Sequence, residues 1–244
     1  MTMKATISAA LLAATLPWTA AADVLDEGRV RELVLETIRE NPEIVLEAVT
    51  LLEQRKIDAQ AATQADVLTR ERELLERDPN APVLGNPDGD VTVVEFFDYN
   101  CPYCRRVKPE VQALIASDPD IRLVYREWPI LGKGSEFAAR AALAAREQGK
   151  YEAFHWALMA LEARADEASV MQVAQNLGLD TQRLRKDMAA PEIDEHIATS
   201  MRLTRELGFN GTPSFVIGDA LVPGLVDLDR LQSLVTEARN EERE

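Results

Sequence analysis

The sequence contains few cysteines and few histidines, with two of each among 244 residues. Because only one cysteine pair can form, a framework of several structural disulfides is excluded. Basic residues are also scarce: 27 lysines and arginines stand against 42 aspartates and glutamates, and the net charge is −15. Such a surface repels the phosphates of nucleic acids and the anionic headgroups of lipids. We therefore expect no nucleic-acid partner.

The sequence also lacks an apolar run that crosses a membrane comfortably. Its most apolar stretch, residues 5–16, follows Lys4 and is itself followed by small residues that end at Ala22. This order predicts a secretory signal peptide over residues 1–22, with cleavage before Asp23. The alternative is an uncleaved membrane anchor, for which the run is short. A cleaved signal predicts a periplasmic protein, in a compartment where disulfides form.

The two cysteines, Cys101 and Cys104, directly follow the apolar, strand-like residues 91–97. The pattern predicts a helix that begins where this strand ends, with Cys101 in its first turn. There, unpaired backbone N–H groups and the positive end of the helix dipole stabilise a thiolate. Cys104 follows one turn later, close enough to form a disulfide with Cys101. Because no further cysteine is available, the pair predicts dithiol–disulfide exchange without a cofactor.

Two structural alternatives exist for the cysteine pair. It can form a permanent disulfide, or it can supply half of a four-ligand zinc site. A zinc site needs two more ligands, and the only histidines, His155 and His196, are distant in the sequence and lie in segments predicted to be helical. We therefore favour redox chemistry and expect no metal.

The residues before the cysteines predict a long helical segment. Residues 24–77 are highly charged, with apolar positions at helical spacing. Asn41-Pro42 interrupts the pattern and predicts the start of a second helix of about 35 residues. Its apolar stripe is too narrow to stabilise such a helix alone in water. Either the helix folds back on the main domain, or it associates with copies of itself. We favour a homo-oligomer formed through residues 42–77.

Turn-forming residues at 79–90 mark a domain boundary. Beyond them the sequence predicts a strand, a helix and a second strand, at residues 92–97, 101–117 and 121–127. This spacing predicts a right-handed βαβ unit with a parallel strand pair. Residues 135–207 predict several helices with short breaks. A hairpin turning at Gly218-Asp219 and a helix over residues 227–239 complete the pattern.

Three motifs carry a resemblance to a known family. They are Val-Glu-Phe-Phe-Asp-Tyr-Asn-Cys-Pro-Tyr-Cys at residues 94–104, Glu-Trp-Pro-Ile-Leu-Gly at 127–132 and Gly-Thr-Pro-Ser-Phe at 211–215. Together they resemble the DsbA-like branch of the thioredoxin superfamily, over about residues 83–240. The resemblance implies an α/β thioredoxin fold with a helical insertion at about 135–207. The domain occupies residues 79–244 and follows an N-terminal helical arm at 23–78.

A second resemblance concerns the arm. Asn41-Pro42-Glu43-Ile44-Val45 and the helical residues around it resemble N-terminal extensions of some bacterial members of the family. These members include trimeric disulfide isomerases related to ScsC. The resemblance implies that the arm serves oligomerisation.

The DsbA-like resemblance also implies roles for individual residues. Cys101 is the solvent-exposed nucleophile, and Cys104 is the thiol that resolves the mixed disulfide. Glu95 is a buried carboxylate with a raised pKa that moves protons during exchange. The plain alternative for Glu95 is a solvent-facing side chain on an edge strand.

Thr212-Pro213 resembles the loop that faces the cysteines in this superfamily, where the proline is cis. A cis bond exposes neighbouring backbone groups that pair with an extended substrate. The alternative is an ordinary proline before a strand. Elsewhere, we expect His155 to pack between helices, and Arg105, Arg106 and Lys108 to form a solvated helix face rather than to support the thiolate.

Together these features predict a periplasmic protein thiol:disulfide oxidoreductase, acting as an isomerase or an oxidase. Its substrates are secreted cysteine-containing proteins, and a membrane redox partner resets its dithiol. Cys-Pro-Tyr-Cys alone does not decide the direction, whereas the long arm favours the isomerase. A different class of protein, a soft-metal module that holds Cu(I) between the same two thiols, is the alternative.

Overall fold

The computed structural model describes residues 26–241, so the signal peptide predicted at residues 1–22 lies outside the described part. The chain divides into two units, Met1–Lys56 and Ile57–Glu244, which we call the N-terminal and C-terminal units. Within residues 26–241, no helix is both long enough and apolar enough to cross a bilayer.

Two helices meet at Asn41-Pro42, as predicted. Helix α1 spans Glu27–Glu40 and α2 spans Glu43–Arg77, with the predicted length of 35 residues. Asp26 begins α1 by accepting a 2.7 Å hydrogen bond from the Arg29 N–H. Asn41 ends α1, because its backbone N–H donates to the Thr37 carbonyl oxygen, 2.9 Å away. The sequence analysis assigned Asn41 only to the start of the second helix.

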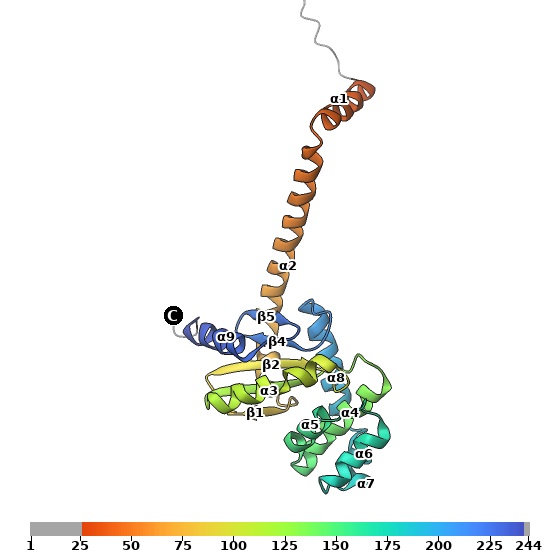
Figure 1. Cartoon of the computed structure of the whole chain (residues 1–244), viewed down its shortest axis with the longest axis vertical. Helices are drawn as coiled ribbons and strands as arrows, with labels where there is room; N and C mark the ends of the chain where they lie inside the picture. The colour runs from red at the N-terminus through yellow and green to blue at the C-terminus, as the bar shows by residue number, and fades with distance from the viewer. Residues whose placement is uncertain (1–25, 242–244) are drawn as a thin grey trace, which may run out of the picture. The chain divides into compact units, whose positions relative to one another are not determined.

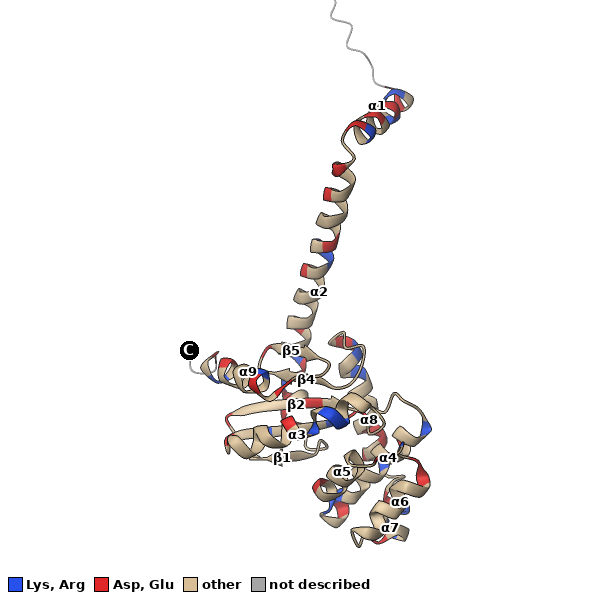
Figure 2. Ribbon diagram, viewed as in Figure 1, with Lys and Arg blue, Asp and Glu red and all other residues tan. Residues whose placement is uncertain are grey.

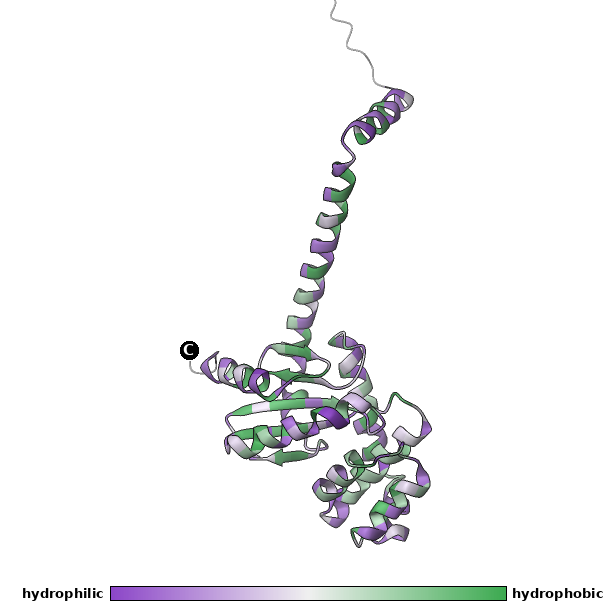
Figure 3. Cartoon of the chain, viewed as in Figure 1, coloured by the Kyte–Doolittle hydropathy of each residue, from purple (hydrophilic) through white to green (hydrophobic). Residues whose placement is uncertain are grey.

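The N-terminal unit exposes an apolar surface. None of the described α1 residues is buried, and α2 has no buried residue before Val67. The large apolar side chains of this unit that are exposed are Val30, Val34, Leu35, Ile44, Val45, Leu46, Val49, Leu51 and Leu52. Figure 3 shows apolar residues recurring along both helices, and Figure 2 shows acidic and basic residues between them. A helix with this pattern is poorly stabilised by its own sequence and gains by association.

A five-stranded sheet forms the centre of the C-terminal unit, with strand order β1-β3-β2-β4-β5. The strands are β1 (Val83–Gly85), β2 (Val91–Phe97), β3 (Ile121–Glu127), β4 (Ser214–Ile217) and β5 (Ala220–Pro223). Strands β2 and β3 are parallel and joined by α3 (Pro102–Ser117), which confirms the predicted βαβ unit. The β4–β5 hairpin is also as predicted. Strand β1 was missed, because it is short and lies in the segment assigned to turns.

The predicted insertion is a group of helices between β3 and β4 (Figure 1). It contains α4 (Lys133–Ala144), a 3₁₀ turn (Ala145–Gln148), α5 (Tyr151–Met159), α6 (Glu167–Asn176), α7 (Thr181–Asp187) and α8 (Pro191–Glu206). Helix α9 (Leu228–Glu241) follows the hairpin and contacts α3. The α/β thioredoxin fold with a helical insertion is therefore confirmed.

The two faces of the sheet are covered by different helices, because side chains alternate along a strand. On one face, Val93 and Phe97 belong to a large apolar cluster with residues of α3, α5 and α9. On the other face, Val94 and Phe96 pack against residues of α2 and α8. The residues that α2 buries there are Val67, Leu68 and Leu75. The end of α2 thus belongs to the core of the C-terminal unit, although the sequence analysis grouped residues 57–78 with the arm.

Candidate active site

A short loop between β2 and α3 positions the two cysteines. The carboxylate of Asp98 accepts hydrogen bonds from the N–H groups of Asn100, 2.7 Å away, and Leu131, 2.9 Å away. The side chain of Asn100 in turn bonds both the N–H and the carbonyl oxygen of Ala165. These contacts tie the loop to the helical insertion. They hold Cys101 in extended geometry as the residue before α3, so that Pro102 begins the helix.

Both cysteines are free thiols, and both are buried. Cys104 is 1% exposed, and Cys101 is only 4% exposed. The expectation that Cys101 is solvent-exposed is therefore wrong. The reason is the loop before β4, which packs over the thiol: Cys101 Sγ donates a hydrogen bond to the carbonyl oxygen of Thr212, 3.1 Å away.

The pKa values of the two thiols are shifted in opposite directions. The pKa of Cys101 falls from 9.0 to about 6, chiefly because the Cys104 thiol donates a hydrogen bond to its sulfur. Burial opposes this shift, whereas the Thr212 side chain and the backbone N–H groups of Cys104 and Tyr103 add to it. Those N–H groups are unpaired donors of the first turn of α3, as the sequence analysis expected. The pKa of Cys104 is raised, foremost by burial and then by its bond to Cys101.

Glu95 lies in the middle of the sheet. Strand β2 is flanked by β3 and β4, and the residues paired with Glu95 are Tyr125 and Phe215. The side chain is 3% exposed, so the solvent-facing alternative on an edge strand is wrong. Glu95 alternates with Val93 and Phe97 and therefore faces the apolar cluster that contains Cys104. Burial, followed by the charge of Cys101, raises the pKa of Glu95 from 4.5 to about 8.

The Thr212–Pro213 peptide bond is cis, as the resemblance implied. Strand β4 follows directly and pairs with β2, with Ser214 opposite Phe96, and this pairing brings the loop to the cysteines. Two hydrogen bonds hold the loop: the Gly224 N–H donates to the Pro213 carbonyl oxygen, and Ser214 Oγ donates to the Gly211 carbonyl oxygen.

The basic residues after Cys104 do not form the solvated helix face that we expected. Only Arg106 is exposed. Arg105 is half-buried, and its Nε donates to the Tyr99 carbonyl oxygen, 3.0 Å away. Lys108 is half-buried too, and its Nζ donates to the Trp156 carbonyl oxygen, 3.2 Å away. The insertion covers this face of α3, which the sequence periodicity of α3 alone did not indicate.

Both histidines are buried in polar and aromatic contacts. His155 Nδ1 lies 3.1 Å from Tyr99 Oη, within a group of aromatic rings, and burial lowers its pKa to about 3. This environment agrees with the packing role expected for His155. His196 Nε2 lies 2.7 Å from the Glu127 carboxylate, which also accepts a hydrogen bond from Tyr151. Within residues 26–241, no cluster of three or more histidine, cysteine or acidic side chains is arranged to hold a metal.

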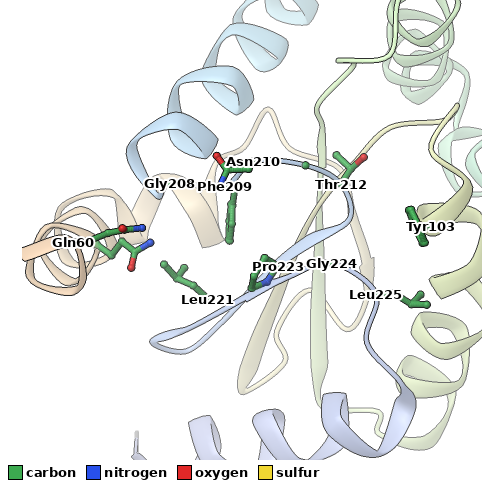
Figure 4. Close-up of a pocket in the computed structure, with 12 residues that line it drawn as sticks. Gln60, Tyr103, Gly208, Phe209, Asn210, Thr212, Leu221, Pro223, Gly224 and Leu225 are labelled. Atoms are coloured by element: carbon green, nitrogen blue, oxygen red, sulfur yellow. The ribbon is translucent and has the colours of Figure 1, made fainter. Parts of the chain in front are cut away.

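A cavity of about 620 Å³ lies beside the dithiol (Figure 4). Tyr103, between the two cysteines, and Thr212 form part of its wall. The other residues that line it are Gln60, Gln64, Gly208, Phe209, Asn210, Gly211, Leu221, Pro223, Gly224 and Leu225. No local pattern in the sequence predicts this cavity, because its wall combines α2, the end of α8 and the hairpin, which are far apart along the chain.

Fold and site together define a protein with a redox-type dithiol on a thioredoxin domain. A family model described as DSBA-like thioredoxin domain matches residues 92–236, more than half of the chain, and the chain belongs to this family of thiol:disulfide oxidoreductases. A second model, described as copper resistance protein ScsC N-terminal domain, matches residues 26–59. The family resemblance drawn from the sequence is confirmed.

Solved structures of similar proteins agree with this assignment. A thioredoxin-like oxidoreductase from Silicibacter pomeroyi is 67% identical, with 69% of this chain and 98% of that chain covered and a TM-score of 0.69. A linker-deletion mutant of Proteus mirabilis ScsC is 31% identical, with 91% and 99% covered and a TM-score of 0.69. The thiol-disulfide exchange protein alpha-DsbA2 from Wolbachia pipientis is also 31% identical, with 73% and 97% covered and a TM-score of 0.68.

Curated relatives include much longer proteins. Na(+)/H(+) antiporter NhaA 3 of Salinispora tropica is 31% identical over 158 residues, which make up 64% of this chain and 24% of the antiporter. The chain thus spans about a quarter of the length of that relative. Disulfide bond formation protein D of Bacillus subtilis is 24% identical over 166 residues, with 63% of this chain and 75% of that protein covered.

Proposed function

We propose that this chain is a periplasmic thiol:disulfide oxidoreductase that exchanges disulfides with secreted cysteine-containing proteins through Cys101 and Cys104. One observation carries the proposal: the pKa of Cys101 is lowered to about 6, and that of its neighbour Cys104 is raised. At neutral pH one sulfur is therefore a thiolate that attacks, and the other stays protonated until it is needed. A cysteine pair that forms only a structural disulfide does not require its two thiols to differ in pKa.

The first step forms a mixed disulfide. The Cys101 thiolate attacks one sulfur of a substrate disulfide, the substrate S–S bond breaks, and the second substrate sulfur leaves as a thiolate. The Thr212 carbonyl oxygen, which accepts the Cys101 S–H in the free thiol form, loses this donor when Cys101 ionises. It is then available to an N–H of an extended substrate segment beside Pro213.

Two outcomes follow from the mixed disulfide. In reduction, Glu95 accepts the Cys104 proton, and the Cys104 sulfur attacks Cys101, so that the internal disulfide forms and the substrate thiolate leaves. The reverse sequence oxidises a substrate dithiol. In isomerisation, another substrate cysteine attacks the mixed disulfide and Cys101 leaves as a thiolate, with no net change in oxidation state. The low pKa of Cys101 makes it a good leaving group in isomerisation and in the last step of substrate oxidation, in which a substrate cysteine displaces it.

The arm favours isomerisation. Its exposed apolar side chains support self-association, and we propose a homo-oligomer formed through residues 42–77. The match of residues 26–59 to the ScsC N-terminal domain supports the same proposal. Facing active sites in one oligomer hold a substrate while its disulfides are rearranged. If the protein is an isomerase, a membrane redox partner keeps its dithiol reduced. If the protein is an oxidase, a membrane redox partner re-oxidises the dithiol instead.

Whether the protein acts as an isomerase or as an oxidase is tested with a scrambled, disulfide-containing test protein. Residues 23–244 of this chain are added to it under mildly reducing conditions, and recovery of its activity is measured. Recovery of activity supports an isomerase. Fast oxidation of a reduced test protein without such recovery identifies a disulfide donor instead. A Cys101→Ser variant is the control, and activity that survives in it contradicts the proposed role of the dithiol.

A second candidate function is the binding of a soft metal ion. Two observations favour it: residues 26–59 match a domain of a protein described as a copper resistance protein, and Cys101 and Cys104 lie in reach of one another. Thiolates favour Cu(I). Stoichiometric Cu(I) on the reduced protein that is lost in Cys101→Ser supports this function, whereas a metal-free dithiol that exchanges with disulfides opposes it.

A further inference from the structure

The cavity beside the dithiol has one wall that comes from α2. Tyr103 and Thr212 lie at the end next to the cysteines, and Gln60 lies at the other (Figure 4). Gln64 also lines the cavity. All of these residues belong to the C-terminal unit. Neither family match includes this wall, because one ends at residue 59 and the other begins at residue 92. Helix α2 therefore adds a surface to the site that the DSBA-like domain by itself does not contain.

The two glutamines differ in what holds them. Gln64 Nε2 donates a 2.8 Å hydrogen bond to the Leu207 carbonyl oxygen at the end of α8, which fixes its side chain. Gln60 is exposed, and its side chain has no hydrogen-bond partner among residues 26–241. Both amides lie over Gly208, since a Cβ at that glycine would meet Gln64 Nε2 at 3.2 Å and Gln60 Nε2 at 3.5 Å. Gln60 thus presents a free amide at the rim of the cavity.

The remaining wall is uncharged. None of the described residues that line the cavity is acidic or basic, although the chain carries a net charge of −15. Phe209, Leu221 and Leu225 supply apolar surface. A Cβ built on Gly211 or Gly224 meets no atom within 4 Å, so a bound backbone has room to approach there. An occupant of this cavity is therefore an extended segment with apolar side chains and without charge.

We propose that Gln60 is a specificity-determining residue for exchange at the dithiol: its side-chain amide binds the backbone of an uncharged, extended substrate segment that flanks the reacting cysteine. The amide offers both a donor and an acceptor, which matches the N–H and C=O of a peptide group. The inference rests on the proposed thiol:disulfide exchange and names the class of segment that the enzyme prefers.

The test uses the oxidised full chain and two blocked peptides with one cysteine each. In one peptide leucines flank the cysteine on both sides, and in the other lysines replace them. We expect Gln60→Ala to lower kcat/KM for the leucine peptide about fivefold through KM, because one hydrogen bond to the bound backbone is lost. We expect Gln60→Glu to shift the ratio of the two kcat/KM values about three- to fivefold toward the lysine peptide. The reason is that the introduced carboxylate forms one partly exposed ion pair with a lysine of that peptide.

A matched control is Ala62→Glu. It adds the same charge to the same helix at an exposed position about 200° around the axis from Gln60. If Ala62→Glu shifts the peptide ratio as much as Gln60→Glu does, or if neither shifts it, Gln60 does not determine specificity. The rate of Cys101 alkylation by iodoacetamide, equal in all variants, shows that the dithiol is unchanged. Failure of the wild-type protein to exchange with either peptide overturns the proposed function, and this inference with it.

Discussion

The thiol of Cys101 donates a hydrogen bond to the carbonyl oxygen of Thr212, 3.1 Å away, although 111 positions separate the two residues in the sequence. The contact closes the loop before β4 over the first turn of α3. As a result the proposed nucleophile is almost completely shielded from solvent. The donors that stabilise its thiolate are other groups, first the Cys104 thiol, whereas the Thr212 carbonyl oxygen accepts only from the protonated form. A substrate must displace part of this loop contact to reach the sulfur.

The low pKa of Cys101 depends first on Cys104. We predict that Cys104→Ala raises the pKa of Cys101 from about 6 toward its ordinary value of 9.0, because the largest favourable contribution, the hydrogen bond from the Cys104 thiol, is lost. The pH dependence of alkylation by iodoacetamide measures this pKa. The Cys101→Ser variant, which has no thiolate to alkylate in this range, gives the background. An unchanged midpoint would show that the first turn of α3 stabilises the thiolate alone.

The proposed second step depends on Glu95. We predict that Glu95→Gln slows the release of peptide from a mixed disulfide with Cys101 about a hundredfold, because no base is left to accept the Cys104 proton. In the wild type this rate increases as pH rises through the pKa of Glu95, which burial keeps above 4.5 and which lies below about 8 in the mixed disulfide, because Cys101 carries no charge there. The Glu95→Gln variant loses this part of the pH profile. Glu162→Gln, at an exposed position, is the control, and equal rates in both variants would exclude Glu95 as the base.

The same carboxyl group makes stability depend on pH. Its pKa is 4.5 when unfolded and about 8 when folded, so the folded state binds more protons between these values. The contribution of Glu95 to stability therefore decreases as pH rises through this window and is lost above about pH 8, whereas the lowered pKa of Cys101 makes an opposite contribution above about pH 6. We predict that Glu95→Gln removes this loss, so that the change in stability of the reduced protein between pH 4 and pH 9 differs from that of the wild type by at most about 5 kcal/mol. Urea unfolding at both pH values measures it. A variant with the wild-type pH dependence would contradict the raised pKa.

The proposed oligomer depends on exposed apolar residues of α2. We predict that Leu52→Lys dissociates it, since a lysine in an apolar helix interface buries an unpaired charge. Sedimentation measures the mass, and the scrambled-protein assay should lose activity in parallel while oxidation of small thiols continues. Thr50→Lys places the same charge about 200° around the helix and serves as control. An unchanged mass for Leu52→Lys would leave the arm without its proposed role.

A buried ion pair links the end of α2 to the sheet. The Arg126 side chain is fully buried, and its Nη1 lies 2.8 Å from Asp78 Oδ2. We predict that Asp78→Ala destabilises the protein by about 3–5 kcal/mol, because it leaves an uncompensated buried charge. Glu237→Ala, which breaks the exposed pair with Arg230, should cost about 1 kcal/mol or less. Urea unfolding of both variants compares them. If both variants lose a similarly small free energy of unfolding, water reaches the Arg126 side chain when the Asp78 carboxylate is removed.

Local patterns in the sequence predicted much of the fold and part of the site. The run from β2 into the cysteine pair predicted where α3 begins and hence why Cys101 favours a thiolate, since the donors belong to its own helix turn. The alternation and turn signals around Gly218-Asp219 predicted the β4–β5 hairpin. The break at Asn41-Pro42 predicted two helices. Each of these features is determined by residues within one or two turns of the chain.

Other features depended on which segments meet in space, and no local pattern contains that information. Glu95 is buried because β2 lies between β3 and β4, and Cys101 is covered because Thr212 is carried to it by strand pairing. The half-buried Lys108 contacts the insertion through the Trp156 carbonyl oxygen, and Arg105 contacts the loop before α3 through the Tyr99 carbonyl oxygen. The apolar stripe of α2 did not distinguish packing on the sheet from self-association, since both bury the same kind of surface. Only the tertiary structure placed Val67, Leu68 and Leu75 in the core and Gln60 at the rim of the cavity.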